Sequence, residues 1–177
     1  MRAPAAILLS LAAMRPSART LYSSRAQVTV AANARGQVFA VLVDAENAKY
    51  SALSLIMKEL ATLGAIVTVR RIYGNFSKPN LAPWREVALA NSFRPVNAFS
   101  FVSGKGTSDA IMIIEAMDCL YTTPNLDGFA LVTSDSDFTP LAQRLREAGR
   151  KVIGFGSRQT PSPFVTACEH FIYTENL

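Results

Sequence analysis

Short apolar runs recur along the chain, separated by polar or turn-forming residues. The clearest is VFAVLV at residues 38–43, and the run at 128–133 leads directly into Ser-Asp-Ser-Asp. Comparable runs occupy residues 65–74 and 151–155. Each is too short for a buried helix and fits a strand whose two faces are both covered. Residues 94–102 predict a further strand, which Pro95 restricts to a sheet edge or to a strand start.

Segments with helical spacing lie between the predicted strands. In residues 49–63 the apolar side chains recur three or four positions apart, as in a helix packed on one face, and Gly64 ends the segment. These side chains are Leu53, Ile56, Met57 and Leu60. Residues 107–120 and 138–148 predict two more helices.

A shorter helix is predicted within residues 79–93. Pro83 suits its first turn, and we expect Trp84 and Leu89 on its inner side. Strands that alternate with helices favour a parallel sheet covered on both faces. We therefore expect an α/β fold of three layers, α/β/α, around a mainly parallel sheet of five or six strands in a Rossmann-like arrangement.

Acidic residues follow the predicted strands at three places. Asp44 directly follows the first strand in VLVDAEN, Asp109 lies at a loop-to-helix junction in GKGTSDA, and Asp135 and Asp137 follow the run at 128–133. The carboxyl ends of parallel strands share one edge, so we expect these four acids to meet there. Residues two apart in an extended segment point the same way, so the last pair is expected to face one point.

Four crowded carboxylates repel one another unless a cation neutralises them. Their hard oxygen atoms favour Mg²⁺ or Mn²⁺ over zinc. Such a cluster, without a nucleophilic side chain, is typical of a site that activates water against a phosphodiester. For Asp109 a second interpretation is simple helix capping, a role that Thr107 or Ser108 would also fill.

Polar residues near these acids are candidates for positioning a substrate. Asn47 would orient a phosphate or the water, and Ser134 and Ser136 would supply hydroxyl groups. Lys105, in the loop at 104–107, would bring an ammonium group to a phosphate at a helix start. That loop lacks the longer Walker pattern, and a plain turn also explains its glycines.

Histidine and cysteine offer no competing metal site. His170 is the only histidine, and beside the apolar residues 171–173 it fits a structural position. Cys119 and Cys168 are the only cysteines, fit positions in or near the core, and are too few for a disulfide framework. A zinc site is therefore not expected.

The net charge of +5 comes from the start of the chain. Residues 1–37 contain five arginines and no acid, whereas residues 38–177 hold 13 basic and 13 acidic residues. Between positions 60 and 105, six basic residues accompany only Glu86. They are Arg70, Arg71, Lys78, Arg85, Arg94 and Lys105. These residues form either a local RNA-binding surface or a scatter of solvated charges.

Aromatic residues accompany two of these arginines. Arg70 and Arg71 lie near the end of the second predicted strand, with Tyr73, Phe76 and Trp84 nearby. Guanidinium groups and aromatic rings would suit the phosphates and bases of a single-stranded RNA. The alternative is that Tyr73 and Trp84 belong to the core.

Residues 1–37 have the composition of an organellar targeting segment. They are rich in Arg, Ala and Ser and carry an apolar patch at 7–13. We expect a transit peptide or disordered leader for the mitochondrial matrix or a plastid, followed by one domain at 38–177. A secretory signal peptide and a misassigned start, which would leave a cytoplasmic protein, are the alternatives. No apolar run approaches the roughly 20 residues of a membrane span, so no membrane partner is expected.

Three segments resemble the successive motifs of the NYN domain, a PIN-like group of metal-dependent ribonucleases. They are VLVDAEN, KGTSDAIMIIEAMD and LVTSDSDFTPLAQRLREAGRKVIGFG. The resemblance runs through residues 38–177, and SDSDF with its following helix is the most specific part. It implies Asn47 as an accompanying polar residue and the following metal-binding acids: Asp44, Asp109, Asp135 and Asp137.

The chain departs from the NYN pattern in places. Glu115 stands where such proteins often carry Asp, and Thr133 stands where a glycine-containing turn is frequent. Glu115 and Asp118 would either support the metal ligands from behind or be merely exposed. The ending TPSPFVTACEHFIYTENL resembles bacterial-type members in which a LOTUS-type winged helix commonly follows.

The resemblance implies a ribonuclease, and we expect an endonuclease that uses Mg²⁺ or Mn²⁺ on single-stranded RNA. It would act alone, as a homo-oligomer, or with an RNA-binding partner protein. Two other classes stay open. One is an RNA-binding or interaction module of the same fold with a weak or inactive site, and the other is a small-molecule phosphatase.

Overall fold

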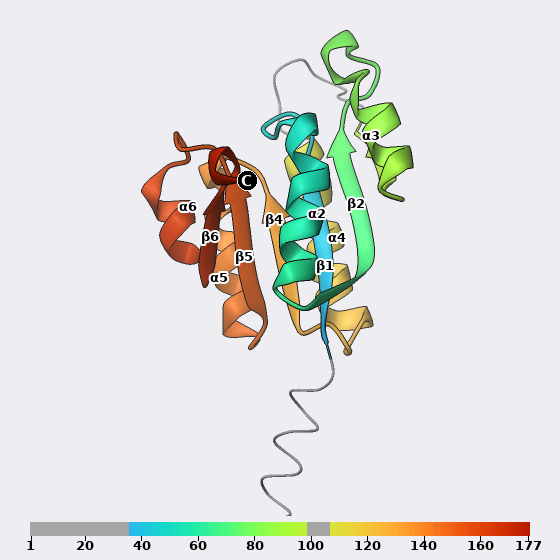
Figure 1. Cartoon of the computed structure of the whole chain (residues 1–177). Helices are drawn as coiled ribbons and strands as arrows, with labels where there is room; N and C mark the ends of the chain where they lie inside the picture. Colours follow the sequence, from blue (N-terminus) through green and yellow to red (C-terminus); the bar gives the residue numbers. More distant parts are fainter. Residues whose placement is uncertain (1–35, 99–106) are drawn as a thin grey trace, which may run out of the picture. The chain divides into compact units, whose positions relative to one another are not determined.

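The computed structural model describes residues 36–98 and 107–177. Within them the chain forms a six-stranded sheet, and Figure 1 labels its strands β1, β2, β4, β5 and β6. Its strands are β1 (Gln37–Asp44), β2 (Ala65–Gly74), β3 (Arg94–Asn97), β4 (Gly128–Val132), β5 (Lys151–Gly156) and β6 (His170–Tyr173). They lie in the order β3-β2-β1-β4-β5-β6, and every pairing is parallel.

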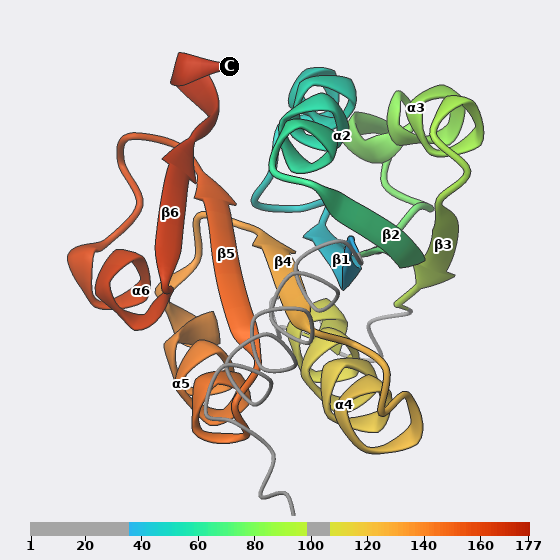
Figure 2. The ribbon, with the colours of Figure 1, turned by 60° about the horizontal axis from the view of Figure 1, so that its bottom comes forward.

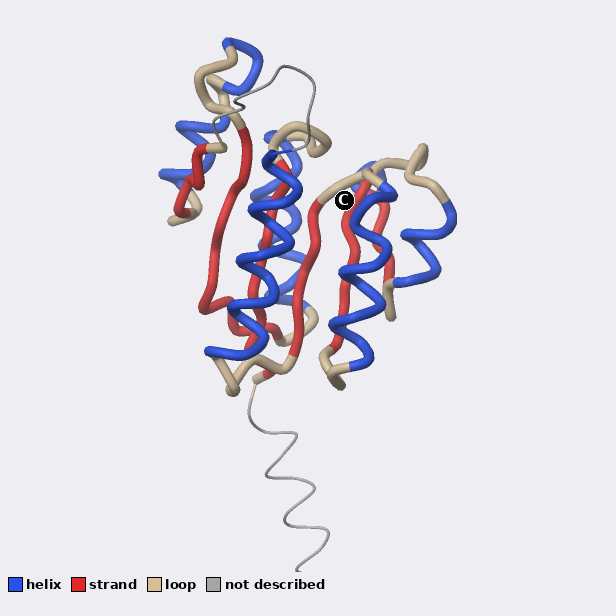
Figure 3. Tube along the Cα trace, turned by 180° about the vertical axis from the view of Figure 1, so that it is seen from behind, coloured by secondary structure: helices blue, strands red, loops and turns tan. Residues whose placement is uncertain are grey.

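Helices cover both faces of this sheet, as Figures 2 and 3 show. On one face α2 (Leu53–Thr62) and α3 (Trp84–Ala90) pack on alternate residues of β1 and β4. On the other face lie α4 (Thr107–Thr122), α5 (Thr139–Glu147) and α6 (Ser162–Ala167). The expected three-layer α/β fold is confirmed, because strands buried on both faces require a helical layer on each side.

The helix ends follow the sequence signals closely. Gly64 and Gly149 take positive φ angles of 76° and 75°, the conformation in which glycine ends a helix. The segment predicted as one helix at 49–63 begins with the 3-10 turn η1 (Tyr50–Ala52) before α2. Further 3-10 turns are η2 (Pro79–Leu81), η3 (Ser136–Phe138) and η4 (Thr174–Asn176).

One side-chain prediction on α3 is wrong. Trp84 is buried, with 2% of its surface exposed, but Leu89 is 76% exposed instead of lying on the inner side. The inward face is taken by Trp84 and Ala88, one helical turn apart, and Leu89 is rotated away from it. The β3 strand ends at Asn97, and residues 99–102 of the longer predicted strand lie outside the described residues.

The cysteines lie in the core as expected, whereas the structural position expected for His170 is not supported by burial. Cys119 and Cys168 are buried free thiols, and burial raises the pKa of Cys168 to about 12. His170 is exposed at the start of β6. In the described ranges no helix combines the length and apolar character needed to cross a bilayer.

The strand order places one crevice at the centre of the sheet. Strand β1 lies between β2 and β4, so the chain leaves β1 toward one edge and later returns to build the other. In open parallel sheets this switch point is where loops diverge and ligands bind, outside the carboxyl ends of the strands. The loops after β1 and β4 border this point, and they carry Asp44, Asp135 and Asp137.

Candidate active site

Asp44 is the fixed point of the site. It ends β1 with only 1% of its surface exposed, on the same face as Ala40 and Leu42. Its Oδ1 atom accepts the backbone N–H groups of Glu46 (3.0 Å) and Asn47 (3.3 Å). Desolvation by burial raises the pKa of Asp44, although its hydrogen bonds act in the opposite direction.

Thr133 joins the loop after β4 to Asp44. Its buried hydroxyl donates to Oδ2 of Asp44 (2.8 Å) and accepts the backbone N–H of Asp135 (3.1 Å). The strand register explains why Thr133 and Asp44 are close. Val43 pairs with Val132 in parallel strands, and Asp44 and Thr133 are the residues that follow them. Thr133 stands where a glycine-containing turn is frequent in the family. Its hydroxyl therefore links the two loops that carry Asp44 and Asp135.

Asp135 and Asp137 lie in a tight turn, so the expected extended alternation is wrong. Asp135 precedes η3, and its Oδ1 atom accepts the backbone N–H of Asp137 at 2.9 Å. This short-range bond forms because an Asp side chain satisfies a donor of the first turn that has no partner within the turn itself. Asp135 is half-buried and Asp137 is exposed, so both carboxylates remain accessible from the sheet edge.

The pKa of Asp109 responds to the negative charges of the other acids. It lies in the first turn of α4, and its pKa is raised to about 6. Burial is the largest cause, followed by the negative charges of Asp44, Asp135, Glu46 and Asp137. A carboxyl is disfavoured in its charged form only by charges that lie close to it. The four predicted acids, from three segments of the chain, are thus near enough for the charges of the other three to act on Asp109.

Glu46 is a member of this cluster that sequence reasoning missed. Its carboxylate accepts a hydrogen bond from Ser108 (3.2 Å) and pairs with Lys78 at 2.6 Å. The bond from Lys78 is the main reason that the pKa of Glu46 is lowered. The signal was its place two residues after Asp44 in a turn, which brings it back beside the edge acid. It also connects the β1 loop to the start of α4.

Of the four residues predicted to position a substrate, one contacts Asp44, two have other partners, and one lies outside the described residues. Asn47 donates its side-chain amide to Oδ2 of Asp44 at 2.9 Å, so it orients the acid directly. Ser134 turns to the loop after β5, where its hydroxyl lies 3.2 Å from that of Ser157. Ser136 is half-buried in η3, and its backbone carbonyl accepts the Thr139 hydroxyl. Lys105 lies outside the described residues.

Glu115 belongs to a separate network on α4. It accepts hydrogen bonds from Arg71 (2.7 Å), Tyr73 (2.9 Å) and Arg94 (3.3 Å). It is not among the charges that raise the pKa of Asp109. Its partners are on β2 and β3, so its contacts secure α4 to the sheet. Asp118 is exposed farther along the same helix.

The arginines and rings predicted to bind RNA are mostly engaged with the protein. Arg71 is paired with Glu115, and Arg70 donates to the backbone carbonyl of Asn91 at 3.0 Å. Tyr73 and Trp84 are 0% and 2% exposed, which confirms the core alternative for both rings and excludes base stacking on them. Trp84 donates its indole N–H to the carbonyl of Ala45 (3.1 Å), directly behind the acid loop.

The donor set suits a hard divalent cation. Among residues 36–98 and 107–177, no three His, Cys, Asp or Glu side chains already stand in the geometry of a bound metal ion. Uncompensated carboxylates repel, and after burial, which is the larger cause, this repulsion contributes to the raised pKa of Asp109. All the converging donors are carboxylate oxygens, which Mg²⁺ and Mn²⁺ prefer. The chemistry of the cluster therefore fits such an ion.

Comparison with known proteins identifies the family. Residues 38–175 match the family model of the NYN domain. An uncharacterised protein of Methanocaldococcus jannaschii is 30% identical over 106 residues. That match covers 59% of this chain and 40% of the relative, so it spans well under half of the relative's length. The domain match covers most of the chain, which therefore belongs to the NYN family of PIN-like nucleases.

Proposed function

We propose that this protein is a Mg²⁺- or Mn²⁺-dependent ribonuclease that cleaves single-stranded RNA internally. The observation that carries the proposal is that acids from the end of β1, the start of α4 and the turn after β4 lie at the carboxyl edge of the sheet, where Thr133 joins Asp44 to the loop of Asp135. Membership of a nuclease family supports the reaction class. The proposed metal-binding and catalytic residues are Asp44, Asp109, Asp135 and Asp137.

The residues around these acids set their positions. Asn47 and Thr133 both donate to Oδ2 of Asp44, which fixes the orientation of that carboxylate. Burial and like charges make the anion of Asp109 costly, so the site favours a ligand that brings positive charge. The chemistry that a bound Mg²⁺ or Mn²⁺ supplies is Lewis-acid stabilisation of the phosphate and a lowered pKa of bound water.

Replacing Asp135 and Asp137 together by Asn tests the proposal. The double variant removes two negative charges while keeping the shape of the turn, so the fold should survive. We expect Mg²⁺-dependent cleavage of a labelled single-stranded RNA to fall by at least about 100-fold, because metal-bound charge stabilisation is worth several kcal/mol. A circular RNA substrate distinguishes internal cleavage from trimming of ends.

Asp118→Asn is the matched control, since Asp118 is an exposed acid on α4 outside the cluster. It should cleave RNA as the wild type does. Equal cleavage by the wild type and the double variant would contradict the proposed site. A wild type that binds RNA but cleaves none, across RNA types and both metals, would favour the second candidate, an RNA-binding module.

A further inference from the structure

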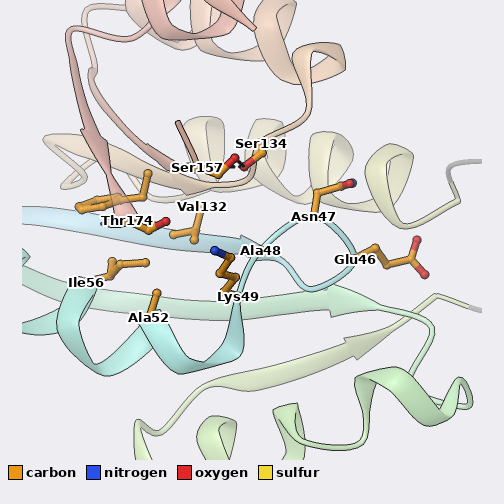
Figure 4. Close-up of a pocket in the computed structure, with 12 residues that line it drawn as sticks. Glu46, Asn47, Ala48, Lys49, Ala52, Ile56, Val132, Ser134, Ser157 and Thr174 are labelled. Carbon is orange, nitrogen blue, oxygen red and sulfur yellow. Dashed lines mark hydrogen bonds between the residues drawn. The ribbon is translucent and has the colours of Figure 1, made fainter. Parts of the chain in front are cut away.

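A cavity of about 280 Å³ opens beside the acid cluster, on the α2 side of the sheet edge. Figure 4 shows its lining residues, which come from the loops after β1, β4 and β5, from the ends of β4 and β5, and from η1, α2 and η4. Glu46 and Asn47 belong to the loop that carries Asp44, and Ser134 directly precedes Asp135. None of Asp44, Asp109, Asp135 and Asp137 lines the cavity, but two loops that carry such acids also border it, so the cavity adjoins the acid cluster near the switch point of the strand order.

The cavity combines an apolar floor with a polar rim. The apolar floor consists of Ile56, Val132 and Phe155, which line the cavity but are 0%, 2% and 0% exposed. On the rim, the backbone N–H of Ser157 donates to the Ser134 hydroxyl at 2.9 Å, and that hydroxyl donates to the Ser157 hydroxyl at 3.2 Å. This arrangement leaves the Ser157 O–H without an acceptor among the described residues. It is available to a hydroxyl or ether oxygen of a ligand.

Lys49 places a cation at the same cavity. Its side chain is 68% exposed, and its ion pair within the described chain is with Glu175 at 3.8 Å, beyond hydrogen-bonding distance. In Figure 4 the Lys49 nitrogen is directed toward Val132, among the lining residues. Lys78, on the other side of the β1 loop, is instead held by Glu46 at 2.6 Å. Lys49 is thus the ammonium group at this cavity that an added anion can engage.

We propose that this cavity holds one nucleoside of the RNA strand next to the cleaved phosphodiester, with Lys49 on a neighbouring phosphate and Ser157 on the ribose. The inference rests on the proposed function. The apolar lining residues are too buried to stack on a base, so the strand is held here through its ribose and phosphate, and a hydroxyl that reads the 2′-OH distinguishes RNA from DNA. The volume is slightly below the roughly 300–1,000 Å³ of pockets for drug-sized ligands, which suits one nucleoside.

Binding measured without divalent ions tests this subsite separately from cleavage. The probes are a short fluorescein-labelled single-stranded RNA and the DNA of the same sequence, followed by fluorescence anisotropy in EDTA. Lys49→Gln should weaken RNA binding about fivefold and reduce the salt dependence of log K by about 0.7, the effect of losing one phosphate contact. Ser157→Ala should reduce the preference for RNA over DNA about fivefold.

Two further variants separate ligand binding from structure. Lys151→Gln removes an exposed lysine at the amino end of β5, far from the acid edge, and should leave the salt dependence unchanged. Glu175→Gln removes the carboxylate that competes for Lys49 and should strengthen RNA binding. If the ion pair were purely structural, Glu175→Gln would instead weaken RNA binding as Lys49→Gln does. Unchanged salt dependence in Lys49→Gln, or an unchanged RNA preference in Ser157→Ala, overturns this subsite. A wild type that binds RNA in this way but never cleaves it overturns the proposed function alone.

Discussion

At the scale of single residues, the carboxylates of Asp44 and Asp109 have different surroundings. Asp44 is almost fully buried and its carboxylate is held by Asn47 and Thr133 through short hydrogen bonds. Asp109 is surrounded by negative charge, and its recorded hydrogen bond is a long one from Ser108, at 3.5 Å. One acid is therefore positioned by the fold, and the other is poised to respond to added positive charge.

This difference predicts how stability depends on pH. The folded-state pKa of Asp109 is about 6, above the ordinary value of 3.8, so the folded protein binds a proton more tightly than the unfolded chain does. The stability that Asp109 contributes is complete below pH 3.8 and is lost as the pH rises through about 6. Without metal, Asp109→Asn should therefore be more stable than the wild type at pH 8, by about 1 kcal/mol after solvent screening.

Thermal unfolding in EDTA at several pH values measures this effect. The advantage of Asp109→Asn should disappear near pH 4, where the wild-type carboxyl is also neutral. Adding Mg²⁺ at pH 8 should raise the Tm of the wild type more than that of the variant, because the ion relieves the same repulsion. A variant less stable than the wild type at pH 8 would show that Asp109 is a structural cap.

At the scale of secondary-structure elements, the network around Glu115 fixes α4 against the sheet. Arg71 and Tyr73 extend from β2, Arg94 extends from β3, and all three donate to one carboxylate. The pKa of Tyr73 is raised, first by burial and then by this carboxylate. Asp109 lies in the first turn of the same helix. The Glu115 network therefore holds α4 in position, although the network itself does not contact the acid cluster.

Glu115→Gln should therefore lower stability more than activity. The change leaves Arg71 without its ion pair in a partly buried setting, which costs about 1–3 kcal/mol. Urea unfolding gives the stability change, and cleavage per folded molecule should stay within about twofold of the wild type. A loss of cleavage comparable to that of the Asp135/Asp137 double variant would instead place Glu115 among the metal ligands.

The sequence predicted the elements better than the contacts between them. The strands were predictable because a run such as residues 38–43 is buried on both faces and needs no partner to be recognised. The exposure of Leu89 was not predictable, because packing decides which face of a short helix points inward. The contact of Glu46 with the start of α4 was not predictable either, because packing also decides how the turn after β1 folds back. Thr133 looked like a neutral departure, since its two bonds join loops distant in sequence.

At the scale of the whole molecule, the site exists only when the central strands are paired. Its acids come from the end of β1, the start of α4 and the turn after β4. The sequence could predict that these segments share an edge, because parallel strands impose it. It could not predict how closely the carboxylates approach, which depends on register and on the side chains between them.

Activity and the buried tryptophan should consequently disappear together in urea. Trp84 is the only tryptophan, is 2% exposed, and donates to the carbonyl of Ala45 beside the site. Its fluorescence, the circular dichroism of the helices and RNA cleavage should share one midpoint, as in a two-state transition. Cleavage lost at clearly lower urea than the other two signals would show that the acid loops open before the sheet does.

The final turn η4 has a practical consequence for handling the protein. Thr174 lines the cavity that we propose for a nucleoside, and Glu175 lies within ion-pair distance of Lys49, so η4 borders the edge that carries the proposed catalytic acids. An affinity tag attached after Leu177 would stand where the incoming strand must pass. Gln37, which opens β1, lies at the opposite edge of the sheet, a full strand length away.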